Sequence, residues 1–225
     1  MRYFKPLITL LIFSSFNAAH SQDIEKAVSM KAAGISYLLS TPVDYTSEQS
    51  YPTIIFLHGG DRSNTKHHPS KYAKKAGLEF PFIVIAPSCT SGCSWSNVDL
   101  KEILIHASAE VSIDRDRVYL IGYSMGGAGA WANLKKMHEL LAAASPIAPA
   151  GGNISNLCKA KDLPIRVYHG TSDYGYQNSQ KMVDALMKCG SSQAELISLD
   201  GQGHGIWPGI FSDGSFYSWL LQQSR

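Results

Sequence analysis

The chain has 225 residues, of which 44% are hydrophobic and 17% are charged. A chain of this length and composition can bury one sizeable core and shows none of the signatures of an intrinsically disordered protein. The formal net charge is only +2, so the composition does not favour nucleic acid or an anionic membrane surface as a partner.

The N-terminus has the pattern of a secretory signal. Two basic residues precede an apolar run over residues 7–16, and small residues occupy the minus-three and minus-one positions of a cut after Ser21. The run is shorter than the about 20 residues that a membrane-spanning helix needs. We therefore predict that residues 1–21 are a cleaved signal peptide with no membrane anchor left after cleavage. Residues 22–225 are predicted to be a single domain that is secreted or periplasmic. Because cleavage removes the two basic residues of the signal peptide, this mature domain has no formal net charge.

Short apolar runs recur along the rest of the chain. The segment "GISYLLSTP" near Gly34 predicts an antiparallel edge strand, and residues 194–199 predict a less buried strand near an edge. The runs between them are continuous rather than alternating, as in strands that helices cover on both faces. These buried strands are predicted at residues 53–57, 82–86, 118–121, 142–148 and 165–168.

Helical patterns separate these strands. In residues 96–112, Ser96 can cap a helix with Asp99 three residues later, and apolar residues follow at helical spacing. Residues 177–189 have a second such pattern. Strands that alternate with helices predict an α/β fold with a mainly parallel sheet. Only residues 149–163 separate two consecutive strands where a cap domain could be inserted, so we expect an open site without a cap domain.

The four cysteines of an exported chain are expected to form two disulfides, for which three pairings are possible. Cys158 precedes a strand, and Cys189 ends a helix that must run back antiparallel to that strand. The two residues then lie at the same edge, which favours a bridge between them. Cys89 and Cys93 would close a short loop. The connectivity stays open at this point.

The segment Gly-Tyr-Ser-Met-Gly, residues 122–126, follows a predicted strand and opens a helical pattern. It matches the G-x-S-x-G nucleophile elbow, in which a serine sits on a sharp strand-to-helix turn. Such a turn leaves no room for side chains at the positions of Gly122 and Gly126. Ser124 would then present its Oγ at a helix N-terminus, where the Met125 amide can donate to an oxyanion.

A serine with an ordinary pKa needs a histidine base, itself held by a carboxylate. Asp173 follows one predicted strand in "YHGTSDYGY", and His204 follows the next in "LDGQGHGIW". Because the carboxyl ends of parallel strands share one edge of a sheet, both residues are expected beside Ser124. The chain order Ser, Asp, His is that of the α/β-hydrolase triad. We predict Ser124 as the nucleophile, His204 as the general base and Asp173 as the acid.

Other carboxylates and histidines fit these roles less well. Asp184 lies inside a predicted helix, Asp162 precedes its strand on the opposite edge, and Asp200 could serve only if its strand ended earlier. No cysteine spacing predicts a zinc site, and no metal is expected. The remaining histidines have commoner structural roles: His58 and His169 at strand ends, His106 and His138 in helices, and His67 and His68 in a solvated loop.

The strand that ends in "HGG" is expected to lead into the second half of an oxyanion hole. Gly60 is our prediction for the second amide donor, with Asp61 as the alternative. Trp95, Tyr123 and Trp207 stand beside the predicted loops. They would either bind substrate in an acyl or aromatic pocket or pack at the edge of the core.

Five segments, "IIFLHGG", "FIVIAPSC", "DRDRVYLIGYSMGGAGAW", "PIRVYHGTSD" and "GHGIW", follow in this order across nearly the whole mature chain. The chain thereby resembles the small secreted α/β-hydrolase esterases, a group that includes carboxylesterase and phospholipase-like proteins, feruloyl esterases and polyhydroxybutyrate depolymerases. The resemblance implies the α/β-hydrolase fold, the triad Ser124, Asp173 and His204, and oxyanion donors at Met125 and Gly60. One departure is the acid loop "SDYGYQN", which lacks the valine-proline that many relatives carry. Related dienelactone hydrolases use cysteine as the nucleophile, where this chain has serine.

The expected activity is hydrolysis of carboxylic esters through an acyl-enzyme, with no cofactor. An open site suits an ester substrate linked to a polymer, such as acyl or feruloyl groups on polysaccharide. A serine peptidase of the prolyl oligopeptidase type is the alternative enzyme, although the chain is too short for a propeller domain. A binding protein that has lost catalysis on a hydrolase fold is the alternative without activity. The acyl group, the alcohol and the oligomeric state stay open.

Overall fold

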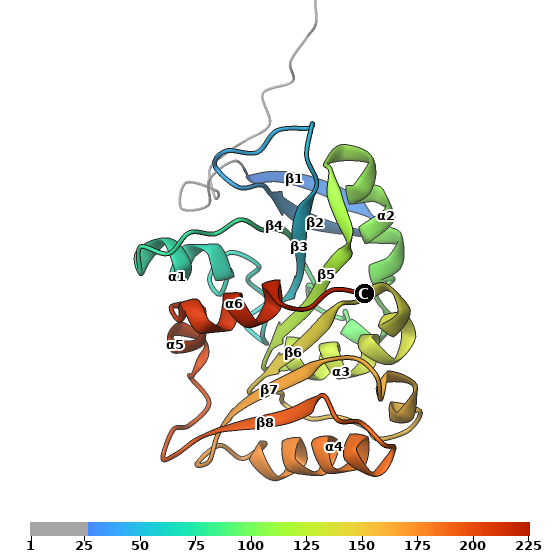
Figure 1. The fold of residues 1–225 in the computed structure, drawn as a ribbon, viewed down its shortest axis with the longest axis vertical. Helices are drawn as coiled ribbons and strands as arrows, with labels where there is room; N and C mark the ends of the chain where they lie inside the picture. The colour runs from blue at the N-terminus through green and yellow to red at the C-terminus, as the bar shows by residue number, and fades with distance from the viewer. Residues whose placement is uncertain (1–26) are drawn as a thin grey trace, which may run out of the picture.

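The computed structural model describes residues 27–225, so the predicted signal peptide lies outside the described residues. Over this range the strands form one eight-stranded sheet with helices on both faces (Figure 1). The strands are β1 (Ala27–Ala32), β2 (Ile35–Ser40), β3 (Tyr51–Leu57), β4 (Ile83–Pro87), β5 (Ile113–Tyr123), β6 (Ala143–Ile147), β7 (Ile165–Gly170) and β8 (Ala194–Leu199). The α-helices are α1 (Pro69–Lys75), α2 (Leu100–Glu110), α3 (Met125–Met137), α4 (Tyr176–Lys188), α5 (Trp207–Phe211) and α6 (Gly214–Leu221). The short 3₁₀ turns are η1 (Trp95–Asn97), η2 (His138–Leu140) and η3 (Leu157–Ala160).

The strand order is β1-β2-β4-β3-β5-β6-β7-β8. Strands β3 to β8 pair in parallel, and β2 pairs antiparallel with both β1 and β4. Every residue of β3, β4 and β6 is buried, because both sheet faces are covered. One hydrophobic cluster joins the sheet to α2, α3 and α4, and a second joins the opposite face to α1, α5 and α6. The expected α/β fold with a mainly parallel sheet is therefore confirmed.

Three details of the sequence analysis were wrong. His67 and His68, expected in a solvated loop, are 3% and 0% exposed, because they are packed under the start of α1. The strand near Gly34, β2, is not an edge strand, because β1 pairs outside it. β1 has the mixed sequence AVSMKA, so no continuous apolar run marks it. The N-cap of α2 is Asp99 rather than Ser96, since the Asp99 carboxylate accepts hydrogen bonds from the amides of Lys101 and Glu102 at 3.0 and 3.1 Å.

Two disulfides cross-link the described chain. One joins Cys89 to Cys93 within the loop after β4, and the other joins Cys158 to Cys189. The second bridge ties η3 to the C-terminal end of α4 and closes a loop with a sequence separation of 31. Loop-closure entropy gives such a cross-link about 4 kcal/mol of stabilisation. No helix within residues 27–225 is long and apolar enough to cross a membrane.

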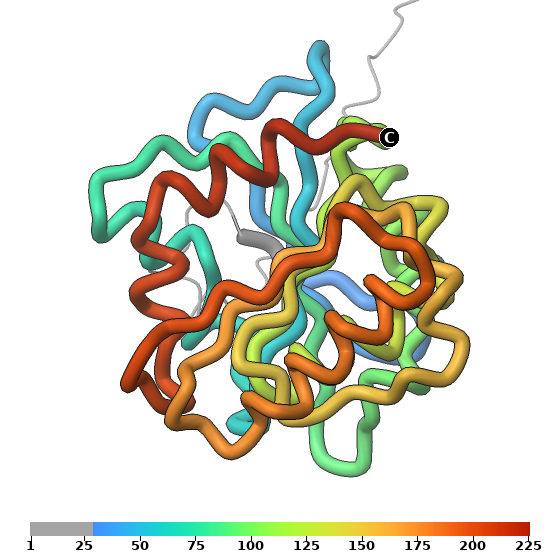
Figure 2. Tube along the Cα trace, turned by 60° about the horizontal axis from the view of Figure 1, so that its bottom comes forward, coloured from blue at the N-terminus to red at the C-terminus, as the bar shows by residue number. Residues whose placement is uncertain are grey.

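The parallel strands bring several connections to one edge of the sheet. The turn after β5 lies there together with the loops that follow β3, β7 and β8, because all four strands end at this edge. Figure 2 shows the β7–α4 and β8–α5 connections running beside each other. A side chain at Gly170 would lie 2.2 Å from the Gln202 carbonyl oxygen, so only glycine lets these two loops approach so closely.

Candidate active site

Three side chains from three different connections form one hydrogen-bonded chain at this edge. Ser124 Oγ lies 2.7 Å from His204 Nε2, and His204 Nδ1 lies 2.7 Å from Asp173 Oδ2. The serine follows β5, the aspartate follows β7 and the histidine follows β8. The structure thus brings together the three residues that the sequence predicted as a triad. It places the competing residues Asp184 in α4 and Asp200 in the turn after β8.

The turn that carries Ser124 has an unusual backbone. Its φ is 55° and its ψ is −114°, a strained conformation for a residue with a side chain. The flanking glycines explain how the turn can form. A side-chain carbon at Gly122 would lie 2.0 Å from the Gly126 carbonyl oxygen, and one at Gly126 would lie 1.9 Å from that of Leu57. The turn therefore presses α3 directly against the end of β3 and leaves the serine hydroxyl at the helix N-terminus.

Asp173 has a second histidine partner that the sequence analysis did not foresee. His169 Nε2 lies 2.7 Å from the same Oδ2 that His204 contacts, and His169 Nδ1 lies 2.7 Å from Ser179 Oγ. Since the Nε2 proton donates to the carboxylate, Nδ1 accepts from the serine hydroxyl. The expected structural hydrogen bond of His169 is thus made to Asp173. The spacing of four residues between His169 and Asp173, across a strand end and a tight loop, was the signal available in the sequence.

These contacts shift the pKa values of Asp173 and His169. Burial acts to raise the pKa of Asp173, but the hydrogen bonds from His204 and His169 outweigh it and hold that pKa below its ordinary value. Burial lowers the pKa of His169 despite the neighbouring Asp173 carboxylate, which favours the neutral form of its imidazole. The site therefore presents an ionised carboxylate to His204, with a neutral histidine on its inner side.

The loop after β3 lies against Ser124. A side-chain carbon at Gly59 would lie 3.5 Å from Ser124 Cβ. The next residue, Gly60, is exposed, and Met125 is the first residue of α3, where an amide has no partner within the helix. Both amides therefore belong to segments that adjoin Ser124. Asp61 turns its carboxylate toward Lys66 Nζ, 3.2 Å away.

The Cys89–Cys93 loop braces this segment. The Arg62 guanidinium donates to the carbonyl oxygens of Cys89 and Thr90. His58 accepts from the Cys89 amide at 2.9 Å through Nε2 and donates to the Gly59 carbonyl at 2.8 Å through Nδ1. The short disulfide loop is thus attached on both sides to the residues that flank Gly60.

Two of the aromatic residues predicted to bind substrate are core residues instead. Trp95 is 2% exposed and donates its indole N–H to the His58 carbonyl oxygen at 3.3 Å. Tyr123 is 6% exposed and lies beneath His204 and Trp207, with ring centroids 5.4 and 4.6 Å away. Their burial supports the packing alternative and leaves no open face for a ligand. Trp207 is half-buried.

The sequence analysis missed one aromatic residue at the site. Tyr174 directly follows Asp173 and is 76% exposed. Its ring stacks on the His204 imidazole with a centroid separation of 5.7 Å and an interplanar angle of 26°. The signal in the sequence was the departure of the acid loop from the valine-proline of its relatives, which puts a tyrosine immediately after the acid.

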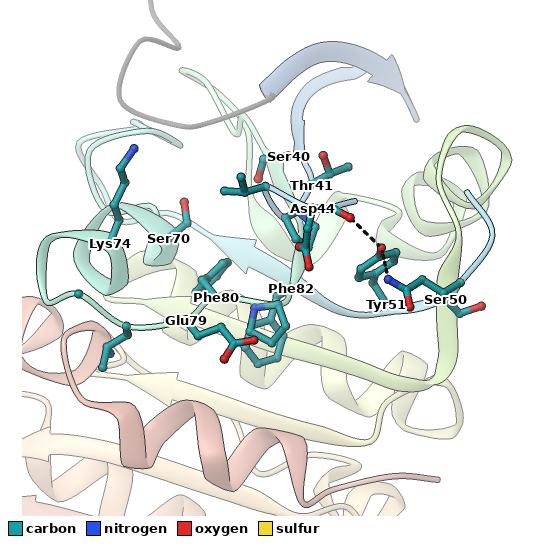
Figure 3. A pocket seen from close by; sticks show the side chains of 16 residues that line it. Ser40, Thr41, Asp44, Ser50, Tyr51, Ser70, Lys74, Glu79, Phe80 and Phe82 are labelled. Atoms are coloured by element: carbon teal, nitrogen blue, oxygen red, sulfur yellow. Dashed lines mark hydrogen bonds between the residues drawn. The ribbon is translucent and has the colours of Figure 1, made fainter. Parts of the chain in front are cut away.

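One hollow in the described part of the chain lies away from these residues. It has a volume of about 670 Å³ and is lined by the β2–β3 connection and the segment between α1 and β4 (Figure 3). Tyr51 and Phe82 border it at the amino-terminal side of β3 and β4, the opposite edge of the sheet from Ser124. None of the predicted catalytic residues lines this hollow. Within residues 27–225, no group of three or more histidine, cysteine or acidic side chains could hold a metal ion.

Comparisons with known proteins agree with this architecture. No family model matches the chain. The bifunctional acetylxylan esterase/xylanase of Neocallimastix patriciarum is 28% identical over 130 residues, a match that covers 54% of this chain and 19% of that protein. The match thus spans about a fifth of the relative's length.

Solved structures are similar over most of the chain. A thermostable esterase has a TM-score of 0.77 and 26% identity, covering 91% of this chain and 64% of its own. The S-formylglutathione hydrolase of Staphylococcus aureus has a TM-score of 0.69 and 16% identity, covering 87% and 96%. The feruloyl esterase module of Clostridium thermocellum has a TM-score of 0.66 and 15% identity, covering 83% and 84%. The chain therefore has the α/β-hydrolase fold, and its structural neighbours include esterases of that fold.

Proposed function

We propose that the protein is a secreted serine esterase that hydrolyses carboxylic esters with Ser124 as the nucleophile. The observation that carries the proposal is the unbroken pair of 2.7 Å hydrogen bonds from Ser124 through His204 to Asp173. A serine becomes nucleophilic only when a neighbouring base accepts its proton, and the base needs a third group to orient it. The contacts of His204 with Ser124 and with Asp173 support this assignment.

The proposed reaction uses these three side chains in turn. Ser124 Oγ attacks the ester carbonyl carbon while His204 Nε2 accepts the hydroxyl proton. The ionised Asp173 holds the Nδ1 proton and stabilises the imidazolium that forms. The amides of Met125 and Gly60 donate to the oxyanion of the tetrahedral intermediate. His204 then gives its proton to the leaving alcohol, and a water molecule, deprotonated by the same histidine, releases the acid from Ser124.

The substrate class that fits is an ester of polysaccharide, with an acyl or feruloyl group as the acid. The connection between β6 and β7 is too short to form a cap domain, and Gly60 and Ala150 lie exposed at the rim of the site. A bulky polymer can approach such a rim. The names of an acetylxylan esterase and a feruloyl esterase among the similar proteins support this class. Two disulfides support export to an oxidising compartment, after removal of residues 1–21.

The test compares the wild-type protein with Ser124→Ala, and with Ser218→Ala as a matched change of an exposed serine on α6. The substrates are 4-nitrophenyl acetate, acetylated xylan, a feruloylated arabinoxylan and a peptide 4-nitroanilide. We expect ester turnover that falls by about 10⁴-fold or more in Ser124→Ala and stays unchanged in Ser218→Ala. Amide turnover without ester turnover would instead indicate a peptidase. Equal inactivity of all three proteins, with retained polysaccharide binding, would indicate a binding protein.

A further inference from the structure

Tyr174 is exposed in a way that packing does not explain. Its side chain is 76% accessible, whereas the other aromatic side chains of residues 29–225 are buried or partly buried. One face of the ring lies on the His204 imidazole, with the centroids 5.7 Å apart. An aromatic ring left in water forgoes the free energy of burying a large apolar surface. A ligand that covers the exposed face would recover that free energy.

The position of Tyr174 identifies the half of the substrate that it meets. During ester hydrolysis, the imidazole of His204 must hand its proton to the oxygen of the leaving alcohol. The alcohol half therefore leaves past the imidazole. The acyl half stays bonded to Ser124, beside the loop of Gly59 and Gly60. Because Tyr174 stacks on the imidazole, its ring borders the path of the alcohol half.

The surroundings of Tyr174 suit an alcohol that is itself both polar and apolar. Ser172, Gln177 and Gln202 are exposed near it, and the Ser172 amide donates to the Gln202 carbonyl oxygen at 3.0 Å, so the two loops adjoin. Asp173 is the only charged residue from 171 to 180, and it is buried. A fatty alcohol would need a contiguous apolar patch. The other large exposed apolar side chains of the described chain are Val43, Ile105, Ile154, Met187 and Leu221. Ile154 shares a hollow with Asn178, and none of the five belongs to the loops that carry Tyr174 and Gln202.

A sugar ring matches this combination. A pyranose carries C–H groups on its faces, which pack on an aromatic ring, and hydroxyl groups at its edge, which bind amide and hydroxyl side chains. We propose that Tyr174 is a binding platform for an uncharged sugar ring in the alcohol half of the ester. The proposal rests on the proposed esterase function and names the part of the substrate that determines specificity.

The kinetic test uses three esters that place a ring in different halves. Ethyl acetate has no ring, methyl ferulate has a ring in the acyl half, and a monoacetylated methyl xyloside has a ring in the alcohol half. Tyr174→Ala removes the platform, Tyr174→Phe keeps the ring, and Met187→Ala removes another exposed apolar side chain as the control. We expect Tyr174→Ala to raise KM for the xyloside by about 10-fold with kcat within about 2-fold, as for the loss of one stacking contact. Tyr174→Ala should show no comparable change in KM for the other two esters. Tyr174→Phe and Met187→Ala should show no comparable change in KM for the xyloside.

Three outcomes contradict the platform. If Tyr174→Ala lost activity equally on all three esters, Tyr174 would only position His204. If it lost activity on methyl ferulate alone, the Tyr174 ring would contact the acyl half instead. If it lost no activity on any ester, the Tyr174 ring would bind no part of the substrate. A binding measurement separates this proposal from the proposed function. In Ser124→Ala, which cannot turn over substrate, a neutral xylo-oligosaccharide should bind more weakly when Tyr174→Ala is added. Inactivity of the wild type on every ester would contradict the esterase, while this binding difference would still test the platform.

Discussion

The burial of His68 lets us predict how the free energy of unfolding depends on pH. Its side chain is completely buried before α1, where Nδ1 lies 2.7 Å from Ser70 Oγ and the ring packs against Phe56. Burial lowers the pKa of His68 from 6.5 to about 3, because the charged imidazolium loses its hydration. Between these two values the unfolded chain binds a proton at this position and the folded chain does not. Stability is therefore lost as the pH falls through this range.

The size of the effect follows from the two pKa values. At about pH 7.5 the histidine is neutral in both states and contributes almost nothing. At about pH 5, proton binding by the unfolded state alone lowers the free energy of unfolding by about 2 kcal/mol. His58, His67 and His169 are also buried, and their pKa values are lowered as well, so they add to the loss in the same direction.

Urea unfolding at about pH 7.5 and about pH 5 measures this loss in the wild type, in His68→Gln and in His138→Gln. His138 lies in the partly exposed turn η2 and serves as the matched control. We expect His68→Gln to lose about 2 kcal/mol less than the wild type between the two pH values, and His138→Gln to lose as much as the wild type. Each variant is compared with itself, so a change in its absolute stability does not affect the result. A loss in His68→Gln equal to that of the wild type would refute the reasoning.

Three further predictions concern the site. Gly126→Ala should lower the melting temperature and the ester turnover together, because its methyl group would overlap the backbone of β3; normal turnover would contradict the assigned turn. His169→Phe should lower kcat by about 10- to 100-fold with little change in KM, because Asp173 loses a charge-assisted hydrogen bond; steady-state kinetics with unchanged kcat would show that His204 alone orients the acid. Replacing Cys89 and Cys93 together with serine should lower kcat by more than about 10-fold, because the loop of Gly60, the proposed oxyanion donor, loses its bracing. Serine replacements in the other disulfide should lower stability and leave kcat unchanged.

Local patterns in the sequence were enough to predict most of the sheet. The buried strands appeared as continuous apolar runs because helices cover both faces, and the elbow appeared because only glycine fits beside Ser124. Residues 194–199 have a less continuous apolar run than the other strands, and this correctly indicated the edge strand β8. β1 escaped notice because an edge strand needs no apolar run. A feature that depends only on local structure, such as the burial of a strand or the need for glycine in a turn, can therefore be read from the residue types.

The contacts between distant loops depended on the tertiary structure. The sequence predicted Ser124, Asp173 and His204 together from their order and their strand ends, yet it assigned His169 no contact with the acid. The letters also do not distinguish a buried indole such as Trp95 from an exposed ring such as Tyr174. Burial of a large side chain is decided by which loops pack over it, and those loops come from strands far apart in the chain. Residue types and their spacing therefore determined the candidate chemistry, and the packing of the loops decided which side chains surround it.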